Sequence, residues 1–185
     1  MASSIRDALC VDCLHIVKHR QGNNRNTKRN GVSVMNKRPV IAVIGGKKEA
    51  KAVLKEAEEA GRLIAEGGAT LVTGGLNGVM EAASKGAHFA GGLTVGILPQ
   101  DHKQNANKYI DVPIATGLGI GRNFIIARAV DALIAIGGGY GTLSEIAFGL
   151  QLGKPVIGIR SWDIKGVIPA YDAEDAVAKA FELLK

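Results

Sequence analysis

Apolar runs that end in glycine alternate with helical segments from residue 39 to the end of the chain, and this alternation most restricts the possible folds. The first run, residues 39–44 (PVIAVI), is continuously apolar and stops at Gly45-Gly46. Such a run is typical of a strand that is buried on both faces of a sheet. Residues 48–66 follow with apolar side chains at helical spacing and stop at Gly67-Gly68. A strand followed by a helix opens a βαβ unit.

The same alternation predicts the remaining elements. Further strands are expected at residues 70–73, 93–98, 114–116, 132–136, 155–159 and near 167, and further helices at residues 78–90, 120–130, 142–151 and 172–184. Strands joined by helices pair in parallel through right-handed crossovers. We therefore predict the α/β class, as a Rossmann-like doubly wound parallel sheet with helices on both faces.

Length and charge divide the chain into two regions. A chain of 185 residues is enough for one domain with a proper core. Residues 1–38 hold eight Lys or Arg against two Asp, which accounts for the net charge of +6, and residues 39–185 are formally neutral. We expect residues 1–38 to be a basic, flexible leader and residues 39–185 to be a Rossmann-like nucleotide-binding domain. A neutral domain argues against nucleic acid as a partner.

The leader contains the chain's two cysteines. Cys10, Cys13, His15 and His19 form a C-x2-C-x-H-x3-H cluster, but one short peptide rarely closes a tetrahedral zinc site, so we expect no metal. The domain itself has no cysteine and so no disulfide, which favours a reducing compartment. No apolar run reaches the roughly 18 residues of a membrane span, and no secretory signal is recognisable. The sequence predicts a cytoplasmic location.

The ends of the predicted strands indicate the ligand site. In doubly wound sheets, ligands bind beyond the carboxyl ends of the strands. In this sequence those ends carry small and polar residues: Gly45, Gly46, Thr73, Gly74, Gly75, Gly78, Pro99, Thr116 and Gly117. The most informative end is the turn GGGYG, comprising Gly137, Gly138, Gly139, Tyr140 and Gly141. Because it precedes a helix, its backbone and the helix N-terminus can hold a phosphate, although glycine can also serve turn geometry alone.

Two charged residues near this turn are candidates for chemistry. Glu145 has two possible roles: Thr142 and Glu145 fit a capping box, and a carboxylate in the first helical turn could also stabilise an oxocarbenium-like centre or activate water. Arg122 opens the preceding helix, where a positive charge is unfavourable beside the helix dipole. This favours a functional role for Arg122, in binding a phosphate or in positioning a base. We expect Lys47 and Lys48 to be solvated rather than to bind the ligand.

The segment GGGYGTLSE, residues 137–145, resembles the PGGxGTxxE motif of the LOG family, the cytokinin-activating phosphoribohydrolases. Arg122 lies nine residues before Asp131, as does the arginine of the family's HERK segment before its aspartate. The stretch from Gly74 to Met80 is similar to the family's GGGxxGLM. The resemblance implies that Arg122 and Glu145 hydrolyse the N-glycosidic bond of a nucleoside 5′-monophosphate. It also implies that no cofactor is required and that the protein is a homodimer or larger homo-oligomer.

Three departures from this motif keep a second hypothesis open. Gly137 replaces the proline, Ser144 replaces a frequent glutamate, and Arg122 lacks the flanking Glu and Lys of HERK. Residues 116–123 are more similar to the molybdenum cofactor carrier proteins of the same fold, which hold a phosphorylated pterin unchanged. Our first hypothesis is a phosphoribohydrolase; the alternative is a carrier with the molybdenum cofactor as bound ligand. A DprA-like DNA-binding module is a third.

Overall fold

The computed structural model describes residues 38–185. The cysteine–histidine cluster and all of the basic leader except Arg38 lie outside the described residues. The described part forms seven strands, five α-helices and two short 3₁₀ turns. The strands are β1 (Val40–Gly45), β2 (Thr70–Thr73), β3 (Thr94–Leu98), β4 (Val112–Ala115), β5 (Ala132–Ile136), β6 (Val156–Ile159) and β7 (Ile168–Ala170). The α-helices are α1 (Lys51–Glu66), α2 (Val79–Phe89), α3 (Arg122–Ala129), α4 (Tyr140–Gln151) and α5 (Ala173–Leu183), and the 3₁₀ turns are η2 (Lys103–Asn105) and η3 (Gly119–Gly121).

The strands form one sheet in the order β4-β3-β2-β1-β5-β6-β7, and every neighbouring pair is parallel. The chain runs outward from β1 to β4 and then returns to place β5 on the other side of β1. This reversal of strand order creates the crevice in which doubly wound sheets bind ligands. The predicted fold class is confirmed.

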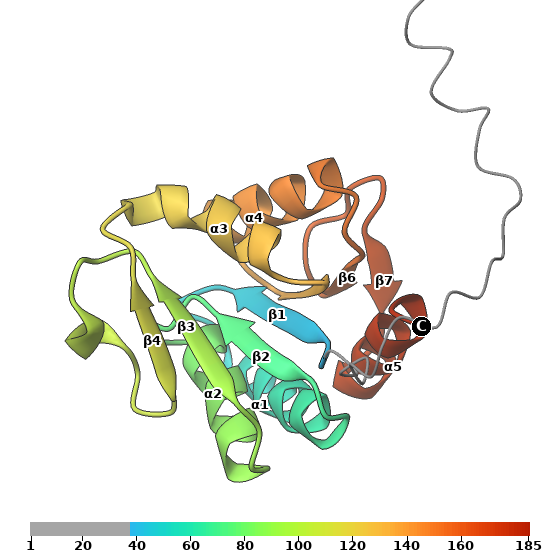
Figure 1. The fold of residues 1–185 in the computed structure, drawn as a ribbon. Coiled ribbons are helices and arrows are strands. Elements are labelled where there is room, and N and C mark those ends of the chain that lie inside the picture. Colours follow the sequence, from blue (N-terminus) through green and yellow to red (C-terminus); the bar gives the residue numbers. More distant parts are fainter. Residues whose placement is uncertain (1–37) are drawn as a thin grey trace, which may run out of the picture. The chain divides into compact units, whose positions relative to one another are not determined.

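Helices cover both faces of the sheet (Figure 1). The helices α1, α2 and α5 pack on one face, where Ile41, Val43 and Ile134 point into the core. The helices α3 and α4 pack on the other face, against Ala42, Ile44 and other alternate side chains of the same strands. The strands β1 and β5 are buried on both faces, as their continuous apolar runs predict. Among residues 38–185, no helix is long and apolar enough to span a membrane.

Three helix starts differ from the pattern-based prediction by two residues or more. The helix expected at residues 48–66 begins at Lys51, with Ala50 as its N-cap residue. The helix expected at residues 120–130 is divided into η3 and α3, so α3 begins at Arg122. The helix expected from residue 142 begins at Tyr140 instead, with Gly139 as its N-cap residue. The last glycines of the GGGYG turn are therefore continuous with the first turn of α4. Because α4 starts at Tyr140, Thr142 is not at the N-cap position and cannot form a capping box with Glu145.

The central strand β5 should carry a large share of the stability. Ile134 is fully buried and is paired with Val43 of β1 and Ile157 of β6. We expect Ile134→Ala to lower the free energy of unfolding by about 2–5 kcal/mol, because the lost apolar contacts leave a cavity. Ile114→Ala on the edge strand β4 is the control, since Ile114 is 45% exposed. Urea unfolding should show a loss below about 1 kcal/mol for the control; equal losses for both variants would contradict the assignment.

Candidate functional site

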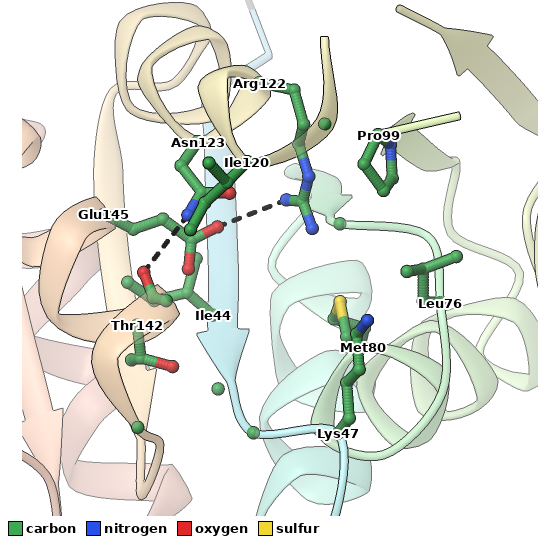
Figure 2. A pocket seen from close by; sticks show the side chains of 16 residues that line it. Ile44, Lys47, Leu76, Met80, Pro99, Ile120, Arg122, Asn123, Thr142 and Glu145 are labelled. Atoms are coloured by element: carbon green, nitrogen blue, oxygen red, sulfur yellow. Dashed lines mark hydrogen bonds and ion pairs between the residues drawn. The ribbon is translucent and has the colours of Figure 1, made fainter. Parts of the chain in front are cut away.

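A pocket of about 430 Å³ lies at the carboxyl edge of the sheet, where the chain reverses between β1 and β5 (Figure 2). Its walls come from four strand ends and from the beginnings of α2, α3 and α4. The lining residues are Ile44, Gly45, Gly46, Lys47, Gly74, Leu76, Met80, Pro99, Gly119, Ile120, Arg122, Asn123, Gly139, Gly141, Thr142 and Glu145. The fold thus brings together residues separated by about a hundred positions in the sequence.

Arg122 and Glu145 form a buried ion pair in this pocket. The Arg122 Nη1 atom donates to Glu145 Oε1 at 3.2 Å, and each side chain is only 8% exposed. Figure 2 shows the two side chains meeting from α3 and α4. Burial raises the pKa of the Glu145 carboxyl to about 7, although the positive charge of Arg122 opposes the rise. The pocket therefore holds a carboxyl group that can gain or lose a proton near neutral pH.

Arg122 has donors that the Glu145 carboxylate does not use. Burial lowers its pKa, with Glu145 opposing. Its Nε atom is buried and has no hydrogen-bond partner among the described residues. A buried donor without an acceptor costs about 1–3 kcal/mol, so an anionic ligand would stabilise this guanidinium. The polar donors fit a phosphate, which could accept from the planar fork of an arginine.

Gly74 makes room for the guanidinium. A Cβ atom at residue 74 would overlap the terminal nitrogens of Arg122 and the sulfur of Met80. We expect Gly74→Ala to displace Arg122 and to weaken binding of a phosphorylated ligand roughly 10-fold. The free energy of unfolding should change by less than about 1 kcal/mol, because the displaced atoms are the far ends of flexible side chains. Calorimetric titration and urea unfolding measure the two quantities, and unchanged affinity would show that Arg122 keeps its position.

The capping-box interpretation of Thr142 and Glu145 is wrong. The helix α4 begins at Tyr140 and has no side-chain cap, so Thr142 lies inside its first turn and Glu145 in the second turn. The Glu145 carboxylate points across to Arg122 instead of returning to the helix backbone. The first backbone bond of α4 runs from the Leu143 N–H to the Gly139 carbonyl. Earlier N–H groups of the helix consequently have no intrahelical partner, which is the arrangement found at helix N-termini that bind anions.

Asn123 is a site residue that the sequence argument did not single out. Its Nδ2 group donates to the Gly141 carbonyl at 3.3 Å and to the Ser144 hydroxyl at 2.8 Å. These bonds hold the start of α3 against the start of α4, which keeps Arg122 and Glu145 aligned. In the sequence, its position directly after Arg122 is the signal that could have indicated a role in the site.

Glu49 is a second residue that the pattern did not reveal. Its Oε1 atom accepts the Gly138 N–H at 3.1 Å, across 89 positions of sequence. The contact joins the loop after β1 to the glycine turn after β5. One N–H of the turn is therefore already used, which leaves the pocket-lining Gly139 and Gly141 and the α4 N-terminus for a ligand.

The predicted binding residues divide into two groups. Those that line the pocket are Gly45, Gly46, Gly74, Met80, Gly139, Gly141 and Thr142, together with Arg122 and Glu145. The others, Thr73, Gly75, Gly78, Thr116, Gly117, Gly137, Gly138 and Tyr140, lie in the adjoining strand ends and loops and are not among the lining residues. Tyr140 is 82% exposed and lies beside Trp162 instead. Lys47, expected to be solvated, is exposed but also lines the pocket.

Comparison with known proteins assigns the chain to one family. Residues 38–182 match the model of the SLOG cluster4 family, so the chain belongs to that family. The resemblance to LOG proteins drawn from the glycine motifs is confirmed. The chain is 34% identical over 119 residues to a cytokinin riboside 5′-monophosphate phosphoribohydrolase of Mycobacterium tuberculosis, in an alignment that covers 60% of this chain and 64% of that protein. The chain thus spans slightly less than two thirds of that relative.

Solved structures of a second functional class match more of the chain. The molybdenum cofactor binding protein of Rippkaea orientalis is 39% identical, with a TM-score of 0.77, and the match covers 81% of this chain and 99% of that one. The molybdenum cofactor carrier protein of Chlamydomonas reinhardtii is 38% identical, with a TM-score of 0.73, over 80% of this chain and 99% of that one. The same fold therefore serves relatives named for hydrolysis and relatives named for carriage.

Proposed function

We propose that the pocket binds one small ring compound that carries a phosphate group. The observation that carries this proposal is that the α4 N-terminus and Arg122 face a single cavity of about 430 Å³. The phosphate accepts from the N–H groups at Gly139, Gly141 and Thr142, with Arg122 within reach as the charged donor. The apolar side chains of Leu76, Met80, Pro99 and Ile120 line the cavity where a flat ring can pack.

Of the two activities among the relatives, we propose carriage of a phosphorylated pterin, the molybdenum cofactor, as the function. The support is the identity of 38–39% to proteins named for that ligand across nearly their full length. The pocket chemistry fits this cargo. The N-terminus of α4 and Arg122 hold its phosphate, and the Glu145 carboxylate accepts from the N–H edge of the pterin ring. Glu145 and Arg122 then act as binding groups, and the ligand leaves unchanged.

Phosphoribohydrolysis is the second candidate, and the buried Arg122–Glu145 pair favours it. In that reaction water adds to C1′ of the ribose while the bond to the base nitrogen breaks. The proton from water finally resides on the released base, and ribose 5-phosphate is the second product. The Glu145 carboxylate, with its pKa near 7, positions the water or stabilises the positive charge that develops at C1′. The same groups, Arg122 and the N-terminus of α4, bind the phosphate in both candidate functions.

One experiment separates the two candidates. Purified protein is incubated with AMP, GMP and a cytokinin riboside 5′-monophosphate, and free base and ribose 5-phosphate are measured by chromatography. In parallel, the protein is mixed anaerobically with molybdenum cofactor released from a molybdoenzyme, and retained molybdenum and pterin are measured after gel filtration. We expect retention of the cofactor and no release of base. Multiple turnovers with any nucleotide would establish the hydrolase instead, and neither retention nor turnover would overturn both candidates.

A further inference from the structure

A second cavity opens beside the pocket. It has a volume of about 370 Å³ and shares two lining residues, Lys47 and Leu76, with the first pocket. Its lining residues are Lys47, Lys48, Leu76, Asn77, Gln100 and Asn105. Five of these six side chains are polar or cationic and none is acidic, so the chemistry differs from that of the apolar-walled first pocket. The two cavities therefore adjoin each other at Lys47 and Leu76.

Hydrogen bonds fix the walls of this second cavity. The Asn107 amide donates to the Leu76 carbonyl at 3.0 Å, and the Asn107 backbone N–H donates to the Gly75 carbonyl at 2.9 Å. These bonds tie the loop after η2 to the loop after β2. On the opposite side, the Gln100 carbonyl accepts from the N–H groups of Thr116 and Gly117 at 3.1 and 3.0 Å. The backbone of the cavity is therefore built before any ligand arrives.

The polar side chains of this cavity have free hydrogen-bonding capacity. The Gln100 Oε1 atom is buried and has no partner among residues 38–185. A buried acceptor of this kind is stabilised by an O–H or N–H donor on a ligand. Lys47 and Lys48 form none of the ion pairs of the described part of the chain. Two uncompensated ammonium groups beside a buried acceptor suit a phosphoryl group that also carries, or is attached to, a hydroxyl.

We propose that this second cavity is a subsite for a second phosphoryl group of the ligand. This inference rests on the proposed function and deepens it, because it makes the preferred ligand a diphosphate or a dinucleotide instead of a monophosphate. The first phosphate lies at the α4 N-terminus in the main pocket. The second lies between Lys47 and Lys48, where the ligand crosses from one cavity to the other. Gln100 accepts from a hydroxyl of the terminal phosphate or of a sugar attached to it.

The test compares mono- and diphosphates of the same base on the full chain. Calorimetric titration with GMP and GDP, AMP and ADP, and phosphate and pyrophosphate is carried out without divalent cations, which would bridge the phosphates themselves. Guanine is included because its amino-oxo-pyrimidine edge matches that of a pterin. We expect the diphosphate to bind at least roughly 10-fold more tightly than the monophosphate of the same pair.

Two variants test whether the gain in affinity from monophosphate to diphosphate comes from the second cavity. Lys48→Met removes one charge from a residue that lines only this cavity, and the gain should fall below roughly 3-fold. Gln100→Leu should reduce it less. Lys165→Met is the matched control, since Lys165 is exposed and lines neither cavity. Equal affinity for both members of each pair, or a gain that survives in Lys48→Met, would overturn the subsite and leave the proposed function standing. If none of the six probes binds, the subsite proposal fails, and retention of the molybdenum cofactor after gel filtration separately decides the proposed function.

Discussion

Arg122→Ala should weaken binding of the phosphorylated ligand roughly 100-fold or more. The guanidinium is the only buried cation among the residues that line the main pocket, and its Nε atom has no partner in the described part of the chain. Removing it takes away the charged donors for the phosphate in a desolvated site, where such contacts contribute about 2–5 kcal/mol. The affinity is measured by titration with the nucleotide or pterin that the wild-type protein retains.

Controls separate the loss of this contact from damage to the fold. Arg128→Ala removes an exposed arginine from the last turn of the same helix and should leave affinity within about twofold. Arg122→Lys keeps a charge but loses the planar fork, so we expect an intermediate affinity. If Arg122→Ala binds as tightly as the Arg128 control, the phosphate does not contact Arg122 and the proposed orientation of the ligand is wrong.

Glu145→Gln should change the pH dependence of stability by about 3 kcal/mol. The ordinary pKa of this carboxyl is 4.5, and burial raises it to about 7 in the folded protein. The folded state therefore holds a proton more tightly than the unfolded state does. The stabilisation from this proton is complete below pH 4.5 and is lost as the pH rises through 7. A tenfold difference in proton affinity corresponds to about 1.4 kcal/mol, which gives the expected magnitude.

The measurement is urea unfolding of wild type and Glu145→Gln between pH 4 and 8. Glutamine cannot titrate, so the free energy of unfolding of wild type minus that of the variant should fall by about 3 kcal/mol as the pH rises across this range. Arg122 is the charged group that faces Glu145 in both proteins, and its own charge does not change over this range. A difference that stays constant with pH would mean that Glu145 is ionised throughout, and its place in either proposed mechanism would need revision.

The alternation of apolar runs and helical segments was sufficient to predict the fold. A continuous apolar run such as residues 39–44 can be buried fully only between two layers of helices. The strand β1 is therefore central, and the sheet is covered on both faces. The order of strands and helices then places every strand end at one edge. For this reason the sequence alone assigns the glycines after β1, β2 and β5 to one region.

Contacts between distant segments could not be predicted in the same way. The TLSE pattern at residues 142–145 fits a capping box locally, but a buried Arg122 from another helix offers Glu145 a stronger partner. Similarly, the Glu49–Gly138 bond joins loops that follow β1 and β5, and no local pattern specifies it. Side chains choose partners by three-dimensional distance, which sequence spacing does not encode.

The sequence alone therefore determined the doubly wound sheet, the edge at which ligands bind and the glycine turn that offers backbone N–H groups. These features depend on hydrophobic periodicity and on backbone geometry, both of which are local properties. The tertiary structure decided that α4 begins at Tyr140, that Glu145 faces Arg122 at 3.2 Å, and that a second polar cavity adjoins the first. These features depend on packing between elements, because burial sets both the partner and the pKa of each charged group.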